Sequence, residues 1–406
     1  MDHNPKQGGF YMVFYRRILP VVNALCPWLL STQAANLSLL IGAILMKRTL
    51  CLTKLATAFP IPAERRVYSP KHELLYRLKR LSRFLGNHRV DPVAVQVAFI
   101  PAILSRLGHP RTLGLIVDWT SFDVTLPKMA KLSGRRKYQV LTIGVPHRGR
   151  TIPLLSVVYE RDKMPERGSQ NRWEEQALTQ VLAALPQGVR PVVIGDRAFG
   201  RAEFIRWLQE RWVDYVLRVR RGTIITAGDG RQWKLGKEGL KQGEVRWVTN
   251  VRYATYHDRP RDLWVNLACS WRSPKRRRAD KKGKEYQEPW YLVTSLGNLG
   301  WAVAWYRQRM WIEENFKDFH STFGLDDAQV GSAQRFAPLV AALSLAVAWL
   351  HLLTLPRVGV LPKGWGASVV TFGRASVVSL ALAFIDYFRD LPPKVLPLPK
   401  SVPKAA

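Results

Sequence analysis

The chain is organised around residues Trp305–Gly324, WYRQRMWIEENFKDFHSTFG. At about 100° per residue, a helix over this stretch gathers a phenol, an imidazole, a carboxylate and two cations within an arc of roughly 80°. These residues are Tyr306, Arg309, Glu313, Lys317 and His320. The neighbouring arc holds the apolar stripe of an amphipathic helix, Trp301, Trp305, Ile312, Phe316 and Phe319. We therefore expect a docked helix with a fixed polar face. The alternative is a solvated ladder of i,i+4 ion pairs.

Composition favours a large protein with a polyanionic partner. The 406 residues can bury a sizeable core and suggest two or three domains. Lys and Arg total 62 against 30 Asp and Glu, a formal net charge of +32, so nucleic acid is the first candidate partner and an anionic membrane the second. The three cysteines form neither a disulfide framework nor a zinc pattern. A reducing compartment fits best.

Two uncharged runs raise the alternative of a membrane protein, Ile18–Met46 and Phe336–Leu355. The second is long enough to span a bilayer. Pro, Ser, Thr and His residues dilute it, however, and the central helix of a large domain can look the same. The first run suits a helix pair, and although Arg16 and Arg17 mimic a secretory signal, no convincing cleavage site follows. We expect a cytoplasmic protein that uses no membrane.

The N-terminal part, residues 1–105, is predicted to be helical. Apolar periodicity runs through Tyr11–Leu30, Ser38–Leu50 and Lys71–Leu85. Basic helix edges of this kind can lie along a DNA backbone; here they carry Lys79, Arg80, Arg83 and Arg89. The alternative is a structural helical cap with solvated charges.

The pattern then changes to strands. Thr112–Phe122, Lys137–Gly149 and Thr151–Glu160 are rich in β-formers, with a hairpin turn between the last two. A helix, a buried strand around PVVIGDRAF, a second helix and the strand DYVLRVRRG follow. The predicted order is three strands, a helix, a strand, a helix, a strand and a late helix that carries Glu313. This is the order of a ribonuclease H-like α/β core. We place this core at 106–221 and 293–335.

Two aspartates are predicted at the tips of buried strands, Asp118 and Asp196. Each alone could be a helix N-cap or a turn residue. Together with Glu313 they supply the oxygen ligands that two Mg²⁺ or Mn²⁺ ions require, about 3.5 to 4 Å apart. The nearest competitors are Asp123, expected past the strand end, and Asp214, which has no supporting motif.

The 117 positions between Asp196 and Glu313 exceed what one crossover needs, which implies a β-rich insertion at 222–292. Its basic run Arg272–Lys284 is of a kind that is usually disordered and solvated, but it could also grip DNA. Two apolar helices, Gln334–Leu355 and Gly373–Phe388, and a Pro-rich tail from Leu391 complete the chain. Residues 336–406 could back the core or form a dimer contact.

The spacing of Tyr306, Arg309 and Glu313 is two residues and then three. This pattern resembles the signature of a family of DDE transposases, the cut-and-paste bacterial insertion-sequence family that carries a YREK motif. The text around the acids is similar too, LIVDWTSF and VVIGDRAFGRAEF, and SRFLGNHRV resembles the end of the family's N-terminal DNA end-binding domain. The resemblance implies that Glu313 is the third metal-binding acid and that Arg309 and Tyr306 contact DNA phosphates. The family has Lys seven residues after the Glu, where this chain has His320, and Lys317 is the possible substitute.

EPWYLVTSL resembles the insertion end of hairpin-forming members, whose Trp stacks on a flipped base. Trp290 corresponds to it, with a core Trp as the alternative. The arginines of the preceding core strand are further candidates for DNA contact, Arg218, Arg220 and Arg221.

The resemblance implies a nucleoid-associated transposase that nicks transposon ends, forms and resolves a hairpin, and joins the end to target DNA in a homodimeric synaptic complex. One alternative is a non-catalytic or decayed DNA-binding protein, although all three acids are present. Another is a basic membrane-associated protein anchored by Phe336–Leu355.

Overall fold

The computed structural model describes residues 5–61, 69–126, 134–161, 170–237, 239–254, 263–271 and 288–353, with 378, 379, 381, 382 and 385. The chain divides into two compact units, the first formed by Met1–Pro110, Trp119–Pro186 and Ile312–Ala406 and the second by Arg111–Asp118 and Gln187–Trp311. This division follows spatial contacts, whereas the four predicted domains follow sequence patterns and stay a prediction. The basic run Arg272–Lys284, the Pro-rich tail and most of the predicted last helix lie outside the described residues.

Five helices open the first unit: α1 (Pro5–Leu25), α2 (Ser31–Lys47), α3 (Leu52–Ala56), α4 (Pro70–Leu85) and α5 (Pro92–Arg106). α2 starts seven residues earlier than the predicted Ser38, and the backbone N–H of Leu30 donates to Gln33 Oε1 at 2.8 Å at this start. Asp91 caps α5 by accepting a hydrogen bond from the N–H of Val93 at 2.8 Å, which satisfies one of the free donors of a helix start.

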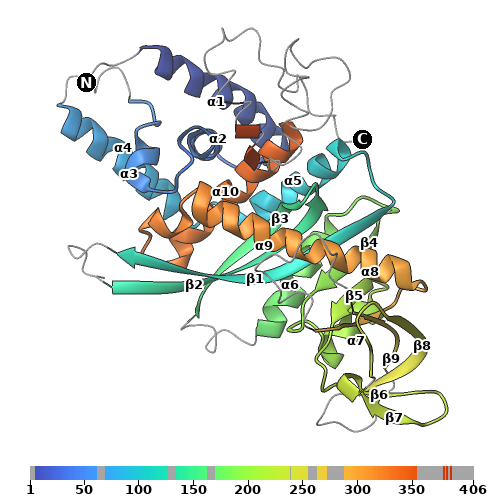
Figure 1. Ribbon diagram of the computed structural model, residues 1–406. Coiled ribbons are helices and arrows are strands. Elements are labelled where there is room, and N and C mark those ends of the chain that lie inside the picture. Colours follow the sequence, from blue (N-terminus) through green and yellow to red (C-terminus); the bar gives the residue numbers. More distant parts are fainter. Residues whose placement is uncertain are drawn as a thin grey trace, which may run out of the picture. The chain divides into compact units, whose positions relative to one another are not determined.

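The helix α10 (Ala333–Leu353) is the central apolar element of the first unit. It packs against β3, α2 and α5, as Figure 1 shows. Within the described residues it is the one helix long and apolar enough to cross a membrane, and 78% of its most apolar window is buried inside the unit. A core helix passes the same test of length and composition. Its buried Ser344 also has an internal partner, since the Ser344 hydroxyl donates to the Ser156 hydroxyl at 2.9 Å.

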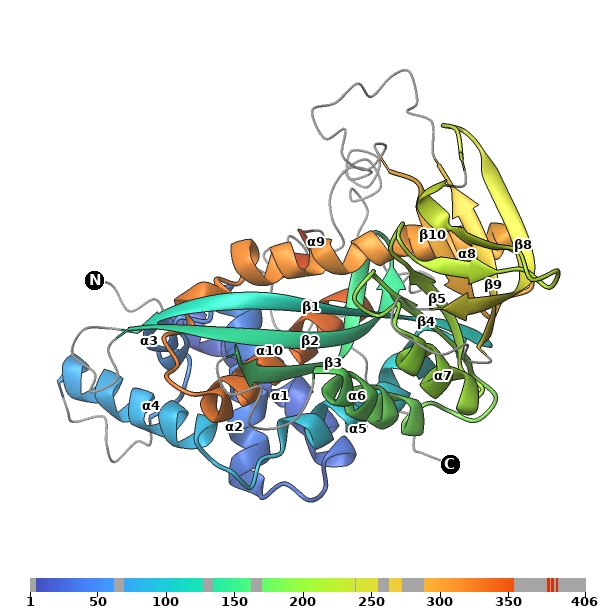
Figure 2. The same ribbon diagram turned by 90° about the horizontal axis from the view of Figure 1, so that it is seen from below.

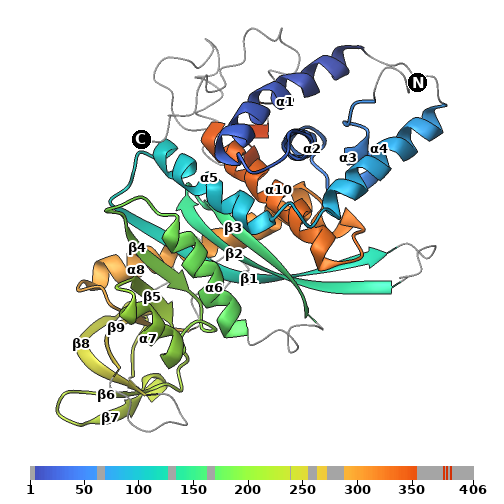
Figure 3. The same ribbon diagram turned by 180° about the vertical axis from the view of Figure 1, so that it is seen from behind.

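The strands of the first unit are the C-terminal half of β1 (Thr112–Leu126), β2 (Gly134–His147) and β3 (Arg150–Glu160), in the order β3-β2-β1. The predicted hairpin is confirmed: β2 and β3 pair antiparallel around the two-residue turn Arg148–Gly149, and both turn residues have positive φ. Figures 2 and 3 show α5, α6 (Gln170–Ala183) and α10 on one face of these strands.

The second unit is built on a sheet of order β1-β4-β5-β10-β9-β8-β6-β7. The N-terminal half of β1 pairs parallel with β4 (Arg190–Gly195), and β4 pairs parallel with β5 (Asp214–Arg218). β10 (Trp290–Thr294) and β9 (Trp264–Ser270) continue the sheet antiparallel, followed by β8 (Val245–Ala254), β6 (Ile224–Thr226) and β7 (Gln232–Lys234). A 3-10 turn, Leu235–Lys237, follows β7. The β-rich segment after β5 thus extends the same sheet.

Two helices cover this sheet, α7 (Ala202–Glu210) on one face and α8 (Leu299–Arg307) on the other (Figure 2). The order of three strands, helix, strand, helix and strand is as predicted, and the protein has a mixed α/β fold.

The predicted helix over Trp305–Gly324 is helical but not uniform. After α8 come a 3-10 turn (Gln308–Met310), α9 (Trp311–Lys317), a π-helical turn (Asp318–Thr322) and a 3-10 helix (Leu325–Ala328). These turns depart from 100° per residue, so the regular helix on which the predicted arc of 80° was based is interrupted before and after α9. The apolar pattern predicts Trp301 in the buried stripe. This prediction is wrong, because Trp301 is 67% exposed. Trp305 does pack inside its unit: a Cβ at Gly114 would lie 2.6 Å from its ring, so only Gly leaves room there.

Candidate functional site

Asp118 and Asp196, the two predicted metal-binding aspartates, lie on neighbouring strands of the second unit. Asp196 directly follows β4, as predicted, and its Oδ1 accepts a hydrogen bond from the Ala198 N–H at 2.8 Å, which fixes the turn. Asp118 lies in the middle of the 15-residue strand β1, not at a strand end, and the competitor Asp123 lies inside the same strand rather than past it. The strand continues because Phe122 and Val124 keep the alternation of buried side chains.

Arg309 joins the two aspartates. Its Nη2 lies 2.8 Å from Asp118 Oδ2 and 3.7 Å from Asp196 Oδ2. The Arg309 and Asp118 side chains are only 12% and 10% exposed, whereas Asp196 is 35% exposed. Two carboxylates from β1 and β4 therefore converge on one positive charge.

Tyr306 and Trp290 lie beside this cluster in the second unit. Burial raises the pKa of the Tyr306 phenol, whereas the charges of Arg218 and Arg309 and a hydrogen bond with Arg218 oppose this rise. The Trp290 ring meets the Tyr306 ring edge to face, with centroids 4.9 Å apart. Trp290 is half-buried, so one part of its ring contacts the fold and another part stays accessible.

The remaining predicted arginines of this region differ in their surroundings. Arg218 ends β5 and is 19% exposed, with its Nη2 3.4 Å from a Glu288 carboxylate oxygen. Glu288 also pairs with Arg197, the residue next to Asp196. Arg220 and Arg221 are exposed. The sequence reasoning missed both Arg197 and Glu288, although each lies inside a stretch singled out for its resemblance, VVIGDRAFGRAEF and EPWYLVTSL.

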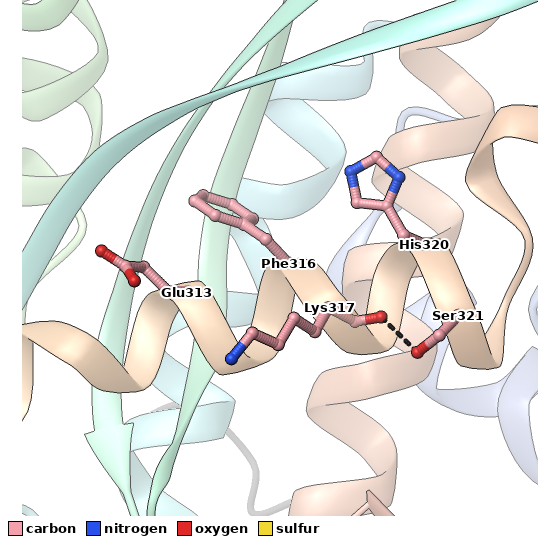
Figure 4. Close-up of a pocket in the computed structure, with 5 residues that line it drawn as sticks. All are labelled: Glu313, Phe316, Lys317, His320 and Ser321. Carbon is pink, nitrogen blue, oxygen red and sulfur yellow. Dashed lines mark hydrogen bonds between the residues drawn. The ribbon is translucent and has the colours of Figure 1, made fainter. Parts of the chain in front are cut away.

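Glu313, the third predicted acid, belongs to the first unit. It lies on α9 and lines an open hollow of about 530 Å³ together with Phe316, Lys317, His320 and Ser321 (Figure 4). The five residues follow one face of the helix at spacings of three and four.

The two candidate DNA-contacting side chains near Glu313, Lys317 and His320, are held by carboxylates. Lys317 is exposed and pairs with Glu314. His320 Nδ1 lies 2.7 Å from Asp326 Oδ2, and its ring packs on Phe122 with centroids 4.4 Å apart. His320, which stands where the family has Lys, is therefore fixed by a carboxylate on one side and an aromatic ring on the other.

Arg150 anchors the helical turn that follows Glu313. Its Nε lies 2.7 Å from Asp318 Oδ2 and its Nη1 3.6 Å from Glu314 Oε2. Burial raises the pKa of the Asp318 carboxyl, and the hydrogen bond and charge of Arg150 oppose that rise. The start of β3 is thus tied to α9 and to the π-helical turn.

The N-terminal basic residues divide into two kinds. Arg80 serves the fold, because its Nε donates to Asn36 Oδ1 at 2.9 Å and its guanidinium lies 5.7 Å from the centre of the Phe59 ring. Lys79, Arg83 and Arg89 are exposed and accessible to a polyanion.

The described residues contain no group of three His, Cys, Asp or Glu side chains close enough to hold a metal ion. The chemistry of the donor set still fits a hard divalent cation. Carboxylate oxygens of Asp118 and Asp196 already face one cation, the Arg309 guanidinium, and such oxygens are the ligands that Mg²⁺ prefers. That Glu313 binds the same metal ions as these two acids stays a prediction, since Glu313 lies in the other unit.

These features define a strongly basic α/β protein whose sheet carries two carboxylates around a cation. Residues 109–349, more than half of the chain, match the family model of the transposase DDE domain, and the match includes Asp118, Asp196 and Glu313. The chain therefore belongs to this family, whose members are enzymes acting on DNA. No curated protein matches the chain.

A half-buried and a fully buried histidine of the first unit, His147 and His351, predict a pH-dependent stability. His147 Nδ1 lies 3.0 Å from His351 Nδ1. Burial, with the charge of Arg148, lowers the pKa of His147 to about 4, and burial, with His147 and Arg150, lowers that of His351 to about 3. Below the unfolded pKa of 6.5 the unfolded chain binds more protons, so stability falls as pH falls. We expect the free energy of unfolding to drop by on the order of 3 kcal/mol between about pH 6.5 and pH 4.

Chemical denaturation across this pH range checks the expectation. His147→Asn places an amide where Nδ1 lies and removes one titrating group, so about half of the drop should disappear. The exposed His88→Asn serves as the control and should keep the full drop. An unchanged drop in His147→Asn would show that other groups cause the pH dependence.

Proposed function

We propose that this protein is a DNA transposase that cleaves strands at the ends of its transposon and joins the freed ends to target DNA. The observation that carries the proposal is the convergence of Asp118 and Asp196 on Arg309 within a chain of the transposase DDE domain family. The formal charge of +32 supports DNA as the partner.

The strand order supports a ribonuclease H-like catalytic core as part of this proposal. In the first unit the order is β3-β2-β1 with an antiparallel β2–β3 hairpin, and in the second β1, β4 and β5 follow in parallel. Such a core delivers carboxylates from neighbouring strands on rigid supports.

Asp118, Asp196 and Glu313 would hold two Mg²⁺ ions, or Mn²⁺ in their place. Bound divalent ions lower the pKa of an attacking water or 3′ hydroxyl and stabilise the leaving oxygen. Arg309 offsets the charge of two converging carboxylates and keeps both side chains aimed at one point. A carboxylate that is already oriented needs little reordering to bind a cation.

The residues around the acids would position DNA. Arg309, Tyr306 and Arg218 form one contact group, in which Tyr306 hydrogen-bonds Arg218 and lies near Arg309. Exposed Arg220, Arg221 and Lys317 would add phosphate contacts, with His320 at the far end of the Glu313 helix face. Trp290 would hold a flipped base during hairpin formation, and its half-buried ring beside Tyr306 supports this role.

We further propose that the protein belongs to the hairpin-forming subfamily with the YREK signature, acts as a homodimer in a synaptic complex and works at the bacterial nucleoid. Residues 1–105 would bind the terminal repeats, since their helices display Lys79, Arg83 and Arg89. One experiment tests the function, the cleavage of DNA by the purified protein.

We expect the protein to nick a duplex that carries the end of its own element when Mg²⁺ or Mn²⁺ is present, and to do nothing in excess EDTA. The substrate is amplified from the DNA flanking the gene, and products are resolved on a denaturing gel. A product that runs as a covalently closed end would support hairpin formation, whereas open ends alone would remove the hairpin step. Absence of any cleavage with each metal would contradict the proposed function.

A further inference from the structure

Glu288 holds two arginines that border the candidate active site. Its carboxylate pairs with Arg197 and lies 3.4 Å from Arg218 Nη2. The three residues come from separate parts of the second unit: Arg197 follows Asp196, Arg218 ends β5, and Glu288 stands two residues before Trp290 at the start of β10.

Positive charge exceeds negative charge at this place. The hydrogen bond and charge of Arg197, with the charges of Arg218 and Arg221, hold the pKa of the Glu288 carboxyl below its usual range. Three guanidinium groups therefore act on one carboxylate. The cluster keeps a surplus of positive charge that suits an anion with more than one charged oxygen.

The Glu288 contact is accessible and easily exchanged. The Glu288 side chain is 51% exposed and that of Arg197 43% exposed, and exposed ion pairs of this kind contribute little to stability. Guanidinium groups bind carboxylate and phosphate with the same paired geometry, so the Glu288 carboxylate stands in for a phosphate here.

The cluster adjoins the acids through one chain neighbour and one hydrogen bond. Arg197 is the next residue after Asp196, and Arg218 hydrogen-bonds Tyr306, which lies near Asp196 and Arg309. Tyr306 also contacts the ring of Trp290. A phosphate on Arg197 and Arg218 would therefore lie on the DNA strand beside the proposed cleavage point.

We propose that Arg197 and Arg218 form a DNA phosphate subsite that the chain's own Glu288 carboxylate fills and must vacate when DNA binds. This inference rests on the proposed function, because it assumes a DNA substrate. The proposed function does not require that Glu288 and a DNA phosphate compete for the same two arginines. This competition lowers the affinity of the free protein for DNA, so that only DNA able to displace Glu288 binds tightly.

Equilibrium binding of a labelled duplex oligonucleotide to the full chain tests the proposal. Glu288→Gln should bind about three- to tenfold more tightly than wild type, because DNA no longer has to break the two ion pairs. Glu210→Gln is the matched control: Glu210 is an exposed carboxylate of the same unit that pairs with its neighbour Arg211, at 3.8 Å. It changes the net charge by the same amount and should leave affinity within about twofold.

A double-mutant cycle locates the effect. In a chain that already carries Arg197→Gln and Arg218→Gln, adding Glu288→Gln should change affinity by less than about twofold, since both ion pairs of Glu288 are already absent. Equal gains in Glu288→Gln and Glu210→Gln, or no gain in either, would overturn the phosphate subsite while leaving DNA binding intact. Failure of the wild-type chain to bind DNA at all would overturn the proposed function, and the subsite with it.

Discussion

Asp118→Asn, Asp196→Asn and Glu313→Gln are each expected to reduce strand cleavage at a transposon end by on the order of a thousandfold or more. Each change keeps the shape of the side chain and removes the charge that a divalent ion requires. Binding to end DNA should stay within a few-fold of wild type, because these acids contribute metal ligation and little phosphate contact. Single-turnover nicking in Mg²⁺ measures the first quantity, and equilibrium binding in Ca²⁺ the second.

Asp123→Asn is the matched control, since Asp123 lies five residues after Asp118 on the same strand. It should cleave within about threefold of wild type, because the change keeps the shape of the side chain and Asp123 is not one of the proposed metal-binding acids. Near-normal nicking by any of the three acid variants would show that this acid is misassigned. A large loss in Asp123→Asn with normal nicking in Asp118→Asn would exchange the roles of the two residues.

Much of the fold follows from local patterns that sequence reasoning can use. Alternating apolar residues predicted β2 and β3, and the two-residue turn at Arg148–Gly149 joins them as expected. A short apolar run followed by Asp predicted β4 and placed Asp196 directly after it. These features succeed because strand alternation and turn geometry depend on neighbours a few residues away.

The helix around Glu313 shows where that reasoning stops. The helical pattern places Trp301 in the buried stripe and Tyr306 on the polar face, but in α8 the buried residues are Ala302, Val303 and Tyr306. A tyrosine can bury its ring when a partner meets its hydroxyl, and Arg218, 88 positions earlier in the chain, supplies that hydrogen bond. No periodicity within the helix contains this information.

Asp118 shows a related difficulty. The polar residues Thr120, Ser121 and Asp123 resemble the end of a strand, yet β1 continues to Leu126 because Phe122 and Val124 face a core built by distant elements. The ion pair between Glu288 and Arg197 joins residues that are 91 positions apart in the chain. Contacts of this range depend on the packed fold. The sequence therefore singled out Asp118, Asp196 and Arg309 as candidates, but it did not predict that these side chains pair.

The largest effect on stability is expected at the ion pair between Arg150 and Asp318. The side chains are 18% and 10% exposed, and the Nε to Oδ2 distance is 2.7 Å. Arg150→Met keeps the aliphatic stem but leaves the Asp318 carboxylate buried beside Glu314, which also loses its contact with Arg150 at 3.6 Å. We expect the free energy of unfolding at pH 7 to fall by about 3 kcal/mol, the usual cost of removing one partner of a buried pair. Denaturant titration measures it, with the exposed Arg161→Met as the control that should change it by less than about 0.5 kcal/mol.

The pH dependence of Arg150→Met separates this explanation from a simple loss of packing. Burial already raises the pKa of Asp318, and without Arg150 it should rise further. The folded variant then binds a proton that the unfolded chain does not, so its deficit relative to wild type should shrink as pH falls toward 5. Adding Asp318→Leu should recover most of the lost stability, because no buried charge remains. A deficit that is constant with pH and is not reduced by Asp318→Leu would mean that Arg150 acts through its packing, and that the turn after Glu313 does not depend on this charge pair.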